Sequence, residues 1–76
     1  MQSLRKLVGN NIRRYRTAIG WSQLKLSVRS GLGENYLGRV ERGEQSITVD
    51  RLAKVANALD IAPYRLLMSP DEKEKK

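Results

Sequence analysis

The sequence contains no cysteine and no histidine among its 76 residues. These absences exclude disulfides and remove the two most common protein ligands of zinc. A chain this short is only marginally stable unless disulfides, a metal, regular helix packing or a partner chain support it. We therefore expect helix packing and oligomerisation to provide the stability, and we expect no metal and no cofactor.

Long apolar segments are also missing. No run approaches the roughly 20 apolar residues that span a bilayer, and residues 1–6 lack the apolar core of a signal peptide. We expect a soluble protein of the cytoplasm with no membrane partner. No nucleophile–base pair, paired carboxylate or phosphate loop is evident, so we expect neither an enzyme nor a small-molecule site.

The charge that is present is strongly positive, with a formal net charge of +7. Residues 69–76 carry equal numbers of acids and bases, so the whole excess lies in residues 1–68. We expect residues 1–68 to form one folded domain, and residues 69–76 to be a disordered charged tail without an apolar face. A folded basic domain favours a polyanionic partner, although many small proteins are basic for solubility alone.

Glycines divide the chain into helix-length segments, and no segment alternates like a strand. Gly20, Gly31 and Gly43 are expected to end helices in the left-handed conformation. Ser22 and Thr48 are good N-cap residues for the segments that follow them. The predicted fold is all-α, with five helices over about 2–19, 22–30, 33–42, 48–59 and 63–68.

Apolar spacing assigns a buried face to each helix. In the first helix this face carries Leu4, Val8, Ile12, Tyr15 and Ile19. In the third helix Leu37 and Val40 turn inward, and Tyr36 flanks them. In the last helix the apolar face carries Tyr64, Leu67 and Met68.

The segment 23–42, QLKLSVRSGLGENYLGRVER, has the internal pattern of a helix-turn-helix. Leu26 precedes the small Ser27 where two helices cross closely, and Gly31 stands at the turn. Leu32 and the inward residues of the next helix then hold the two helices together. Gly38 costs roughly 1 kcal/mol in mid-helix, which indicates a close approach there by DNA or by another helix.

This pattern resembles the Cro/phage-repressor-like (XRE) family of helix-turn-helix transcriptional regulators over about residues 7–68. The resemblance rests on IRRYR at 12–16, GWSQ at 20–23, YL at 36–37 and VERG at 40–43. It continues with Leu52, VA at 55–56, AL at 58–59 and Pro63. It implies a compact five-helix bundle of the lambda-repressor type that binds double-stranded DNA. Two features depart from the family: Leu24 and Val28 stand at usually polar positions, and Gly33 replaces a capping Ser, Thr or Asp. Leu24 and Val28 either extend the core against Trp21 or form an exposed patch for a partner.

The resemblance and the chemistry of the side chains assign DNA-contacting roles. Asn35 suits adenine, Arg39 suits guanine, and Glu34 either accepts from cytosine or only complements the helix dipole. Phosphate contacts are expected from Gln23, Tyr36, Arg42, Gln45, Ser46, and Arg13 or Arg14. Glu44 is expected to point away from the duplex.

Two further roles are structural. Arg16 and Glu41 are expected, from the family, to form an ion pair between the first and third helices. A homodimer is expected from the small core, with an interface at Asn57, Ile61, Tyr64, Leu67 and Met68.

The predicted function is a homodimeric, nucleoid-associated transcriptional regulator, most simply a repressor, that binds an inverted repeat through the major groove. An antitoxin and a restriction-modification controller protein are alternatives within the same fold. A basic protein–protein or membrane-surface module using the first helix is an alternative of another class.

Overall fold

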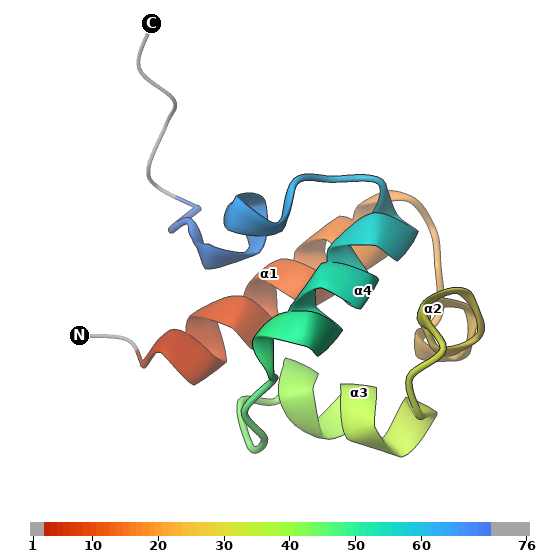
Figure 1. Ribbon diagram of the computed structural model, residues 1–76, viewed down its shortest axis with the longest axis horizontal. Helices are drawn as coiled ribbons and strands as arrows, with labels where there is room; N and C mark the ends of the chain where they lie inside the picture. Colours follow the sequence, from red (N-terminus) through yellow and green to blue (C-terminus); the bar gives the residue numbers. More distant parts are fainter. Residues whose placement is uncertain (1–2, 71–76) are drawn as a thin grey trace, which may run out of the picture.

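The computed structural model describes residues 3–70, which fold into four α-helices and one 3-10 helix (Figure 1). The elements, in chain order, are α1 (Leu4–Ala18), α2 (Gln23–Ser30), α3 (Glu34–Glu41), α4 (Val49–Leu59) and η1 (Pro63–Leu67). The all-α prediction is confirmed, although the fifth element is a 3-10 helix. The predicted start of the first helix at residue 2 and residues 71–76 of the predicted tail lie outside the described residues.

Local capping chemistry sets most of the helix ends. The hydroxyls of Ser22 and Thr48 accept hydrogen bonds from backbone N–H groups in the first turns of α2 and α4, as predicted. Ser3 caps α1 in the same way. Gly31 follows α2 with a φ of 79°, in the left-handed region that favours glycine. Gly33 leaves α3 without a side-chain cap.

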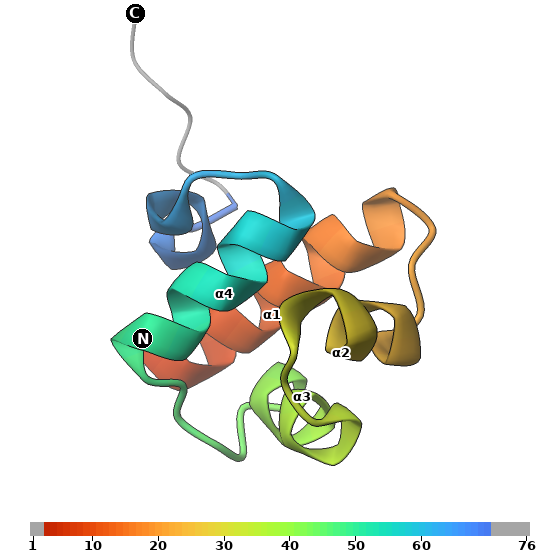
Figure 2. The same cartoon turned by 45° about the vertical axis from the view of Figure 1, so that its right-hand side comes forward.

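The helices enclose one apolar core. α1 packs against α3 and η1, while α2 packs against α3 and α4. Figures 1 and 2 show α2 and α3 together on one side of α4, with η1 on the other. The buried apolar side chains come from every element and the loop before α3: Val8, Ile12, Leu26, Leu32, Leu37, Val40, Leu52, Val55, Ala56, Leu59 and Leu66.

The predicted apolar face of α1 is wrong at both ends. Leu4 and Ile19 are 62% and 50% exposed, because the packed part of α1 is confined to its middle. There Gly9 lies against the end of α3: a Cβ atom at this position would stand 2.2 Å from the carbonyl oxygen of Val40. The glycine therefore allows the two backbones to approach closely.

The predicted apolar face of the last helix is also wrong. Leu66 is the fully buried residue of η1, while Tyr64 and Leu67 are about half exposed. A 3-10 helix has three residues per turn, so the face predicted with α-helical spacing does not apply. The buried amide of Asn11 fixes η1, since its Nδ2 donates to the carbonyl oxygens of Leu66 and Met68 at 2.9 and 2.8 Å.

Candidate nucleic-acid interface

Helix α3 presents a polar face to solvent and an apolar face to the core. Leu37 and Val40 are buried, whereas Glu34, Asn35 and Arg39 are exposed. The three exposed side chains line one shallow hollow in the surface, together with Gln23, Gly38 and Arg42. The fold thus gathers all three predicted base-reading residues beside two predicted phosphate contacts.

Two polar side chains lie close to Gly38 at the centre of α3. A Cβ atom there would lie 3.3 Å from a terminal guanidinium nitrogen of Arg42 and 3.5 Å from Oε1 of Gln23. Gly38 is buried beneath these two side chains. The close approach predicted from the sequence is therefore made, within this structure, by polar side chains.

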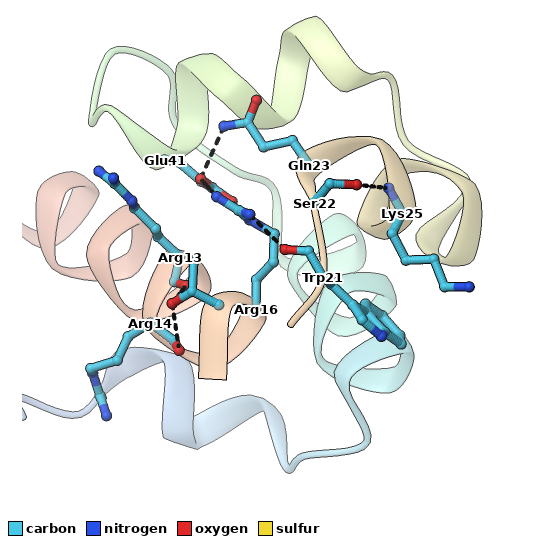
Figure 3. Close-up of polar contacts among 9 residues, drawn as sticks. Arg13, Arg14, Arg16, Trp21, Ser22, Gln23, Lys25 and Glu41 are labelled. Carbon is cyan, nitrogen blue, oxygen red and sulfur yellow. Dashed lines mark hydrogen bonds and ion pairs between the residues drawn. The ribbon is translucent and has the colours of Figure 1, made fainter. Parts of the chain in front are cut away.

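A buried ion pair fixes the orientation of α3. Arg16 Nε donates to Glu41 Oε2 at 2.7 Å, and a second guanidinium N–H donates to Glu41 Oε1 at 2.8 Å (Figure 3). The side chains of Arg16 and Glu41 are only 10% and 3% exposed. The hydrogen bonds from Arg16 to Glu41 raise the pKa of Arg16, although burial opposes the shift. The ion pair predicted between these residues is present.

The ion pair extends to the loop before α2 and to α2 itself. The remaining guanidinium nitrogen of Arg16 donates to the carbonyl oxygen of Trp21 at 2.8 Å. Gln23 Nε2 donates to Glu41 Oε1 at 3.0 Å (Figure 3). Gln23, predicted as a phosphate contact, is thus also a structural link between the first residue of α2 and the end of α3. Its amide has a second N–H that can face a ligand.

The loop after α3 follows Arg42, which lines the hollow, whereas Gln45 and Ser46 line the neighbouring groove with Leu4 and Val49. Arg42 Nε and Glu44 Oε2 lie 3.2 Å apart in an exposed ion pair. Glu44 therefore pairs with a predicted phosphate-contacting residue, and its expected orientation away from a duplex stays a prediction. The Tyr36 hydroxyl and Gln45 Nε2 both donate to the carbonyl oxygen of Ser46 at 3.4 Å. The loop residues predicted to contact phosphate are brought together.

Two cations near this loop were missed from the sequence. The guanidinium of Arg51 lies 5.1 Å from the centre of the Tyr36 ring. Lys6 packs against Gly43, where a Cβ atom would stand 2.6 Å from Lys6 Cγ. Arg51 stands on the first turn of α4 and Lys6 on α1, so only the tertiary fold places them beside the loop.

Arg13 and Arg14 diverge, although the sequence left them as equivalent candidates. Figure 3 shows Arg13 extending on the side of α1 where α3 lies and Arg14 extending toward η1. Arg14 donates to Asn11 Oδ1 at 3.0 Å, and its guanidinium lies 5.0 Å from the centre of the Tyr15 ring. The arrangement favours Arg13 as the DNA-facing residue of the two.

The residues predicted for a dimer interface divide between two surfaces. Asn57 and Ile61 line a shallow pocket with Ala53, Lys54 and Pro63. Leu67 instead lines an apolar groove that also includes Leu4 and Val49. Tyr64 is exposed and Met68 is partly buried. η1 therefore stands between two partly apolar surfaces.

Comparisons with known proteins agree with this architecture. The helix-turn-helix family HTH_3 matches residues 12–66. Within residues 3–70, no helix combines the length and apolar character needed to cross a bilayer.

Three solved structures resemble the chain closely. A hypothetical transcription factor from Neisseria, NHTF, is 39% identical with a TM-score of 0.86, over 91% of this chain and 79% of that one. The restriction-modification controller protein C.AhdI from Aeromonas hydrophila is 42% identical with a TM-score of 0.80, over 82% and 94%. The N-terminal DNA-binding domain of SinR from Bacillus subtilis is 31% identical with a TM-score of 0.81, over 88% and 99%.

Proposed function

The chain belongs to the HTH_3 helix-turn-helix family of DNA-binding transcriptional regulators, which are not enzymes, and from this premise we propose that it is a homodimeric repressor of an inverted-repeat operator. Each protomer inserts α3 into the major groove of one half-site. The main support for this role is the hollow on α3, where Glu34, Asn35 and Arg39 are exposed side by side.

Base reading follows from the chemistry of this hollow. An asparagine amide pairs with the N6 and N7 edge of adenine, an arginine fork pairs with O6 and N7 of guanine, and a carboxylate accepts from the cytosine amino group. Arg39 stands one turn after Asn35, so the two side chains reach neighbouring base pairs. Leu37, Val40 and the Arg16–Glu41 pair hold the helix while these side chains read the groove.

Phosphate contacts position α3 without reading sequence. On one border, Gln23 offers an amide N–H at the start of α2, where the helix dipole also favours an anion. On the other, Arg42 and the loop of Gln45 and Ser46 face the opposite strand. Arg13 adds a cation from α1, and Tyr36 supports the loop through its hydroxyl.

A homodimer gives the operator its inverted symmetry. The exposed Tyr64 and Leu67 on η1, with Ile61 and Asn57 nearby and Met68 partly buried, leave apolar surface that a second copy covers. This surface lies across α4 from α2 and α3 (Figure 2). Two copies joined there keep both α3 helices free for half-sites about one helical turn apart.

The similarity to C.AhdI, a restriction-modification controller protein, makes control of a restriction-modification operon a second candidate role. This candidate shares the DNA site and the dimer with the first. A promoter-fusion assay separates them, because only the second role requires the chain to change transcription from the promoters of a restriction-modification operon.

Selection of bound duplexes from a random pool tests the proposal. The expected product is a motif with two inverted halves, bound by two chains. The logarithm of the binding constant should fall with the logarithm of salt by about 0.9 for each phosphate contacted. Recovery of no enriched motif refutes sequence-specific regulation, and a single half-site bound by one chain refutes the homodimer.

A further inference from the structure

The outward side of α2 carries large apolar side chains that neither the core nor the DNA site uses. Leu24 and Val28 are 56% and 71% exposed. They stand one helical turn apart and therefore share a face. The possibility that they extend the core against Trp21 is wrong, because α2 buries Leu26 and Ser30 instead.

Cations border these apolar residues. Lys25 and Arg29 also stand one turn apart, and both lie over the half-buried ring of Trp21, at 6.0 and 5.6 Å from ring centroids. Within residues 3–70 neither cation forms an ion pair with an acid, and α2 itself contains no acid. We name the surface formed by Trp21, Leu24, Lys25, Val28 and Arg29 the α2 face.

The α2 face is separate from the other surfaces of the molecule. Gln23, on the adjoining side of α2, lines the hollow with α3, whereas no residue of the α2 face does. Ser27 turns toward the turn before α3, where its hydroxyl donates to the carbonyl oxygen of Leu32 at 2.6 Å. Figure 3 shows the Trp21 ring and the Lys25 side chain pointing away from the Arg16–Glu41 pair. η1 lies on the other side of α4 (Figure 2).

We propose that the α2 face binds an acidic amphipathic helix of another protein. Apolar side chains of the partner pack on Leu24 and Val28, and its carboxylates pair with Lys25 and Arg29. The charges favour an acidic partner, because the two cations that border the apolar residues form no ion pair with an acid within residues 3–70, and like charges would be repelled. A helix fits because an i, i+4 stripe of apolar side chains can pack along the similar stripe on α2.

This inference goes beyond the proposed function, because neither base reading nor a dimer through η1 covers the α2 face. A protein held there leaves α3 facing the groove. A regulator with such a surface can carry a protein to its operator, or be recruited by one.

The experiment is a selection from a displayed library of helical peptides, without tryptophan, in which apolar and charged positions vary. The bait is the full chain, counter-selected against the Leu24→Gln/Val28→Gln double variant. Trp21 is the only tryptophan of the chain, so its fluorescence reports binding of each recovered peptide directly. Leu4→Gln/Val49→Gln is the matched control, because it removes two apolar side chains, 62% and 82% exposed, that lie outside the α2 face.

The proposal predicts recovery of acidic amphipathic peptides that bind the parent and the control equally. They should bind the Leu24→Gln/Val28→Gln variant at least about tenfold more weakly, as expected when central contacts are removed. Arg29→Glu should weaken binding of the same peptides, and the Leu24→Gln/Val28→Gln variant, which keeps the net charge, should bind operator DNA like the parent. The peptide measurement uses no DNA, so its failure is distinct from failure of the proposed function.

Several outcomes overturn the proposal. Recovery of basic or neutral peptides would refute an acidic partner. Peptides that bind the double variant as tightly as the parent would show that the binding site lies elsewhere. Loss of DNA affinity in the double variant would make the α2 face part of the DNA site. A change in its sedimentation would make the face a contact between copies of this chain.

Discussion

Replacement of Glu41 by glutamine tests what holds α3 in place. The substitution preserves size but removes the negative charge from a carboxylate that accepts two hydrogen bonds from Arg16 and one from Gln23. A glutamine offers one amide oxygen, and its NH₂ group would face other donors. The guanidinium of Arg16, with a side chain only 10% exposed, would keep its charge without a counter-charge.

The expected loss is large relative to the stability of a small domain. Removing one partner of a buried ion pair costs about 3–5 kcal/mol. A domain of this size has a free energy of unfolding of roughly 4–11 kcal/mol, from about 0.05–0.15 kcal/mol per residue. Since each kcal/mol lowers the melting temperature by about 4–8 °C in such a domain, Glu41→Gln should melt at least roughly 12 °C below the parent.

Urea and thermal unfolding, followed by Trp21 fluorescence and circular dichroism at one fixed protein concentration, measure this loss. Glu44→Gln is the matched control, because it breaks the exposed Arg42–Glu44 pair and should change stability by less than about 1 kcal/mol. Equal melting of Glu41→Gln and the parent at neutral pH would refute the structural role of the Arg16–Glu41 pair.

Three further outcomes are expected from the same unfolding assays. Gly9→Ala should destabilise the fold far more than Gly31→Ala, because its Cβ would overlap the backbone of Val40; equal losses would contradict the crossing of α1 and α3. Asn11→Ala should cost roughly 1–3 kcal/mol by leaving carbonyl groups of η1 unpaired, and an unchanged urea midpoint would contradict this. Because the pKa of Arg16 is raised in the folded chain, Arg16 contributes fully to stability below the ordinary arginine pKa. This contribution is lost only as the pH rises beyond that range, so the melting temperature should not fall between pH 7 and about 9 through this pair.

Features fixed by local chemistry could be predicted from the sequence. The N-caps at Ser22 and Thr48 and the left-handed Gly31 depend on residues within one turn, so both limits of α2 and the start of α4 follow directly. The end of α4 at Asp60, which is left-handed without being glycine, was not predicted. The inward face of α3 follows from apolar spacing. The family resemblance added the Arg16–Glu41 pair, which spacing alone does not specify.

Features fixed by distant partners were missed. Gly9 meets α3, and Asn11 meets η1 more than 50 residues away along the chain. Signals for both existed: a glycine in mid-helix, and an amide next to the buried Ile12. The face of η1 was mistaken because five residues give no periodicity that separates a 3-10 helix from an α-helix.

The central claim is that Arg39 reads a base while Arg42 contacts phosphate. Once the operator is known, the affinities of Arg39→Ala and Arg42→Ala for the operator and for its single-base-pair variants test this most directly. If Arg39 reads a base, Arg39→Ala should lose about 1–3 kcal/mol of binding free energy and its discrimination at one base pair of each half-site. Arg42→Ala should instead weaken binding to all duplexes equally and lower the salt dependence. A uniform loss of affinity in Arg39→Ala, with discrimination intact at every position, would refute base reading by Arg39.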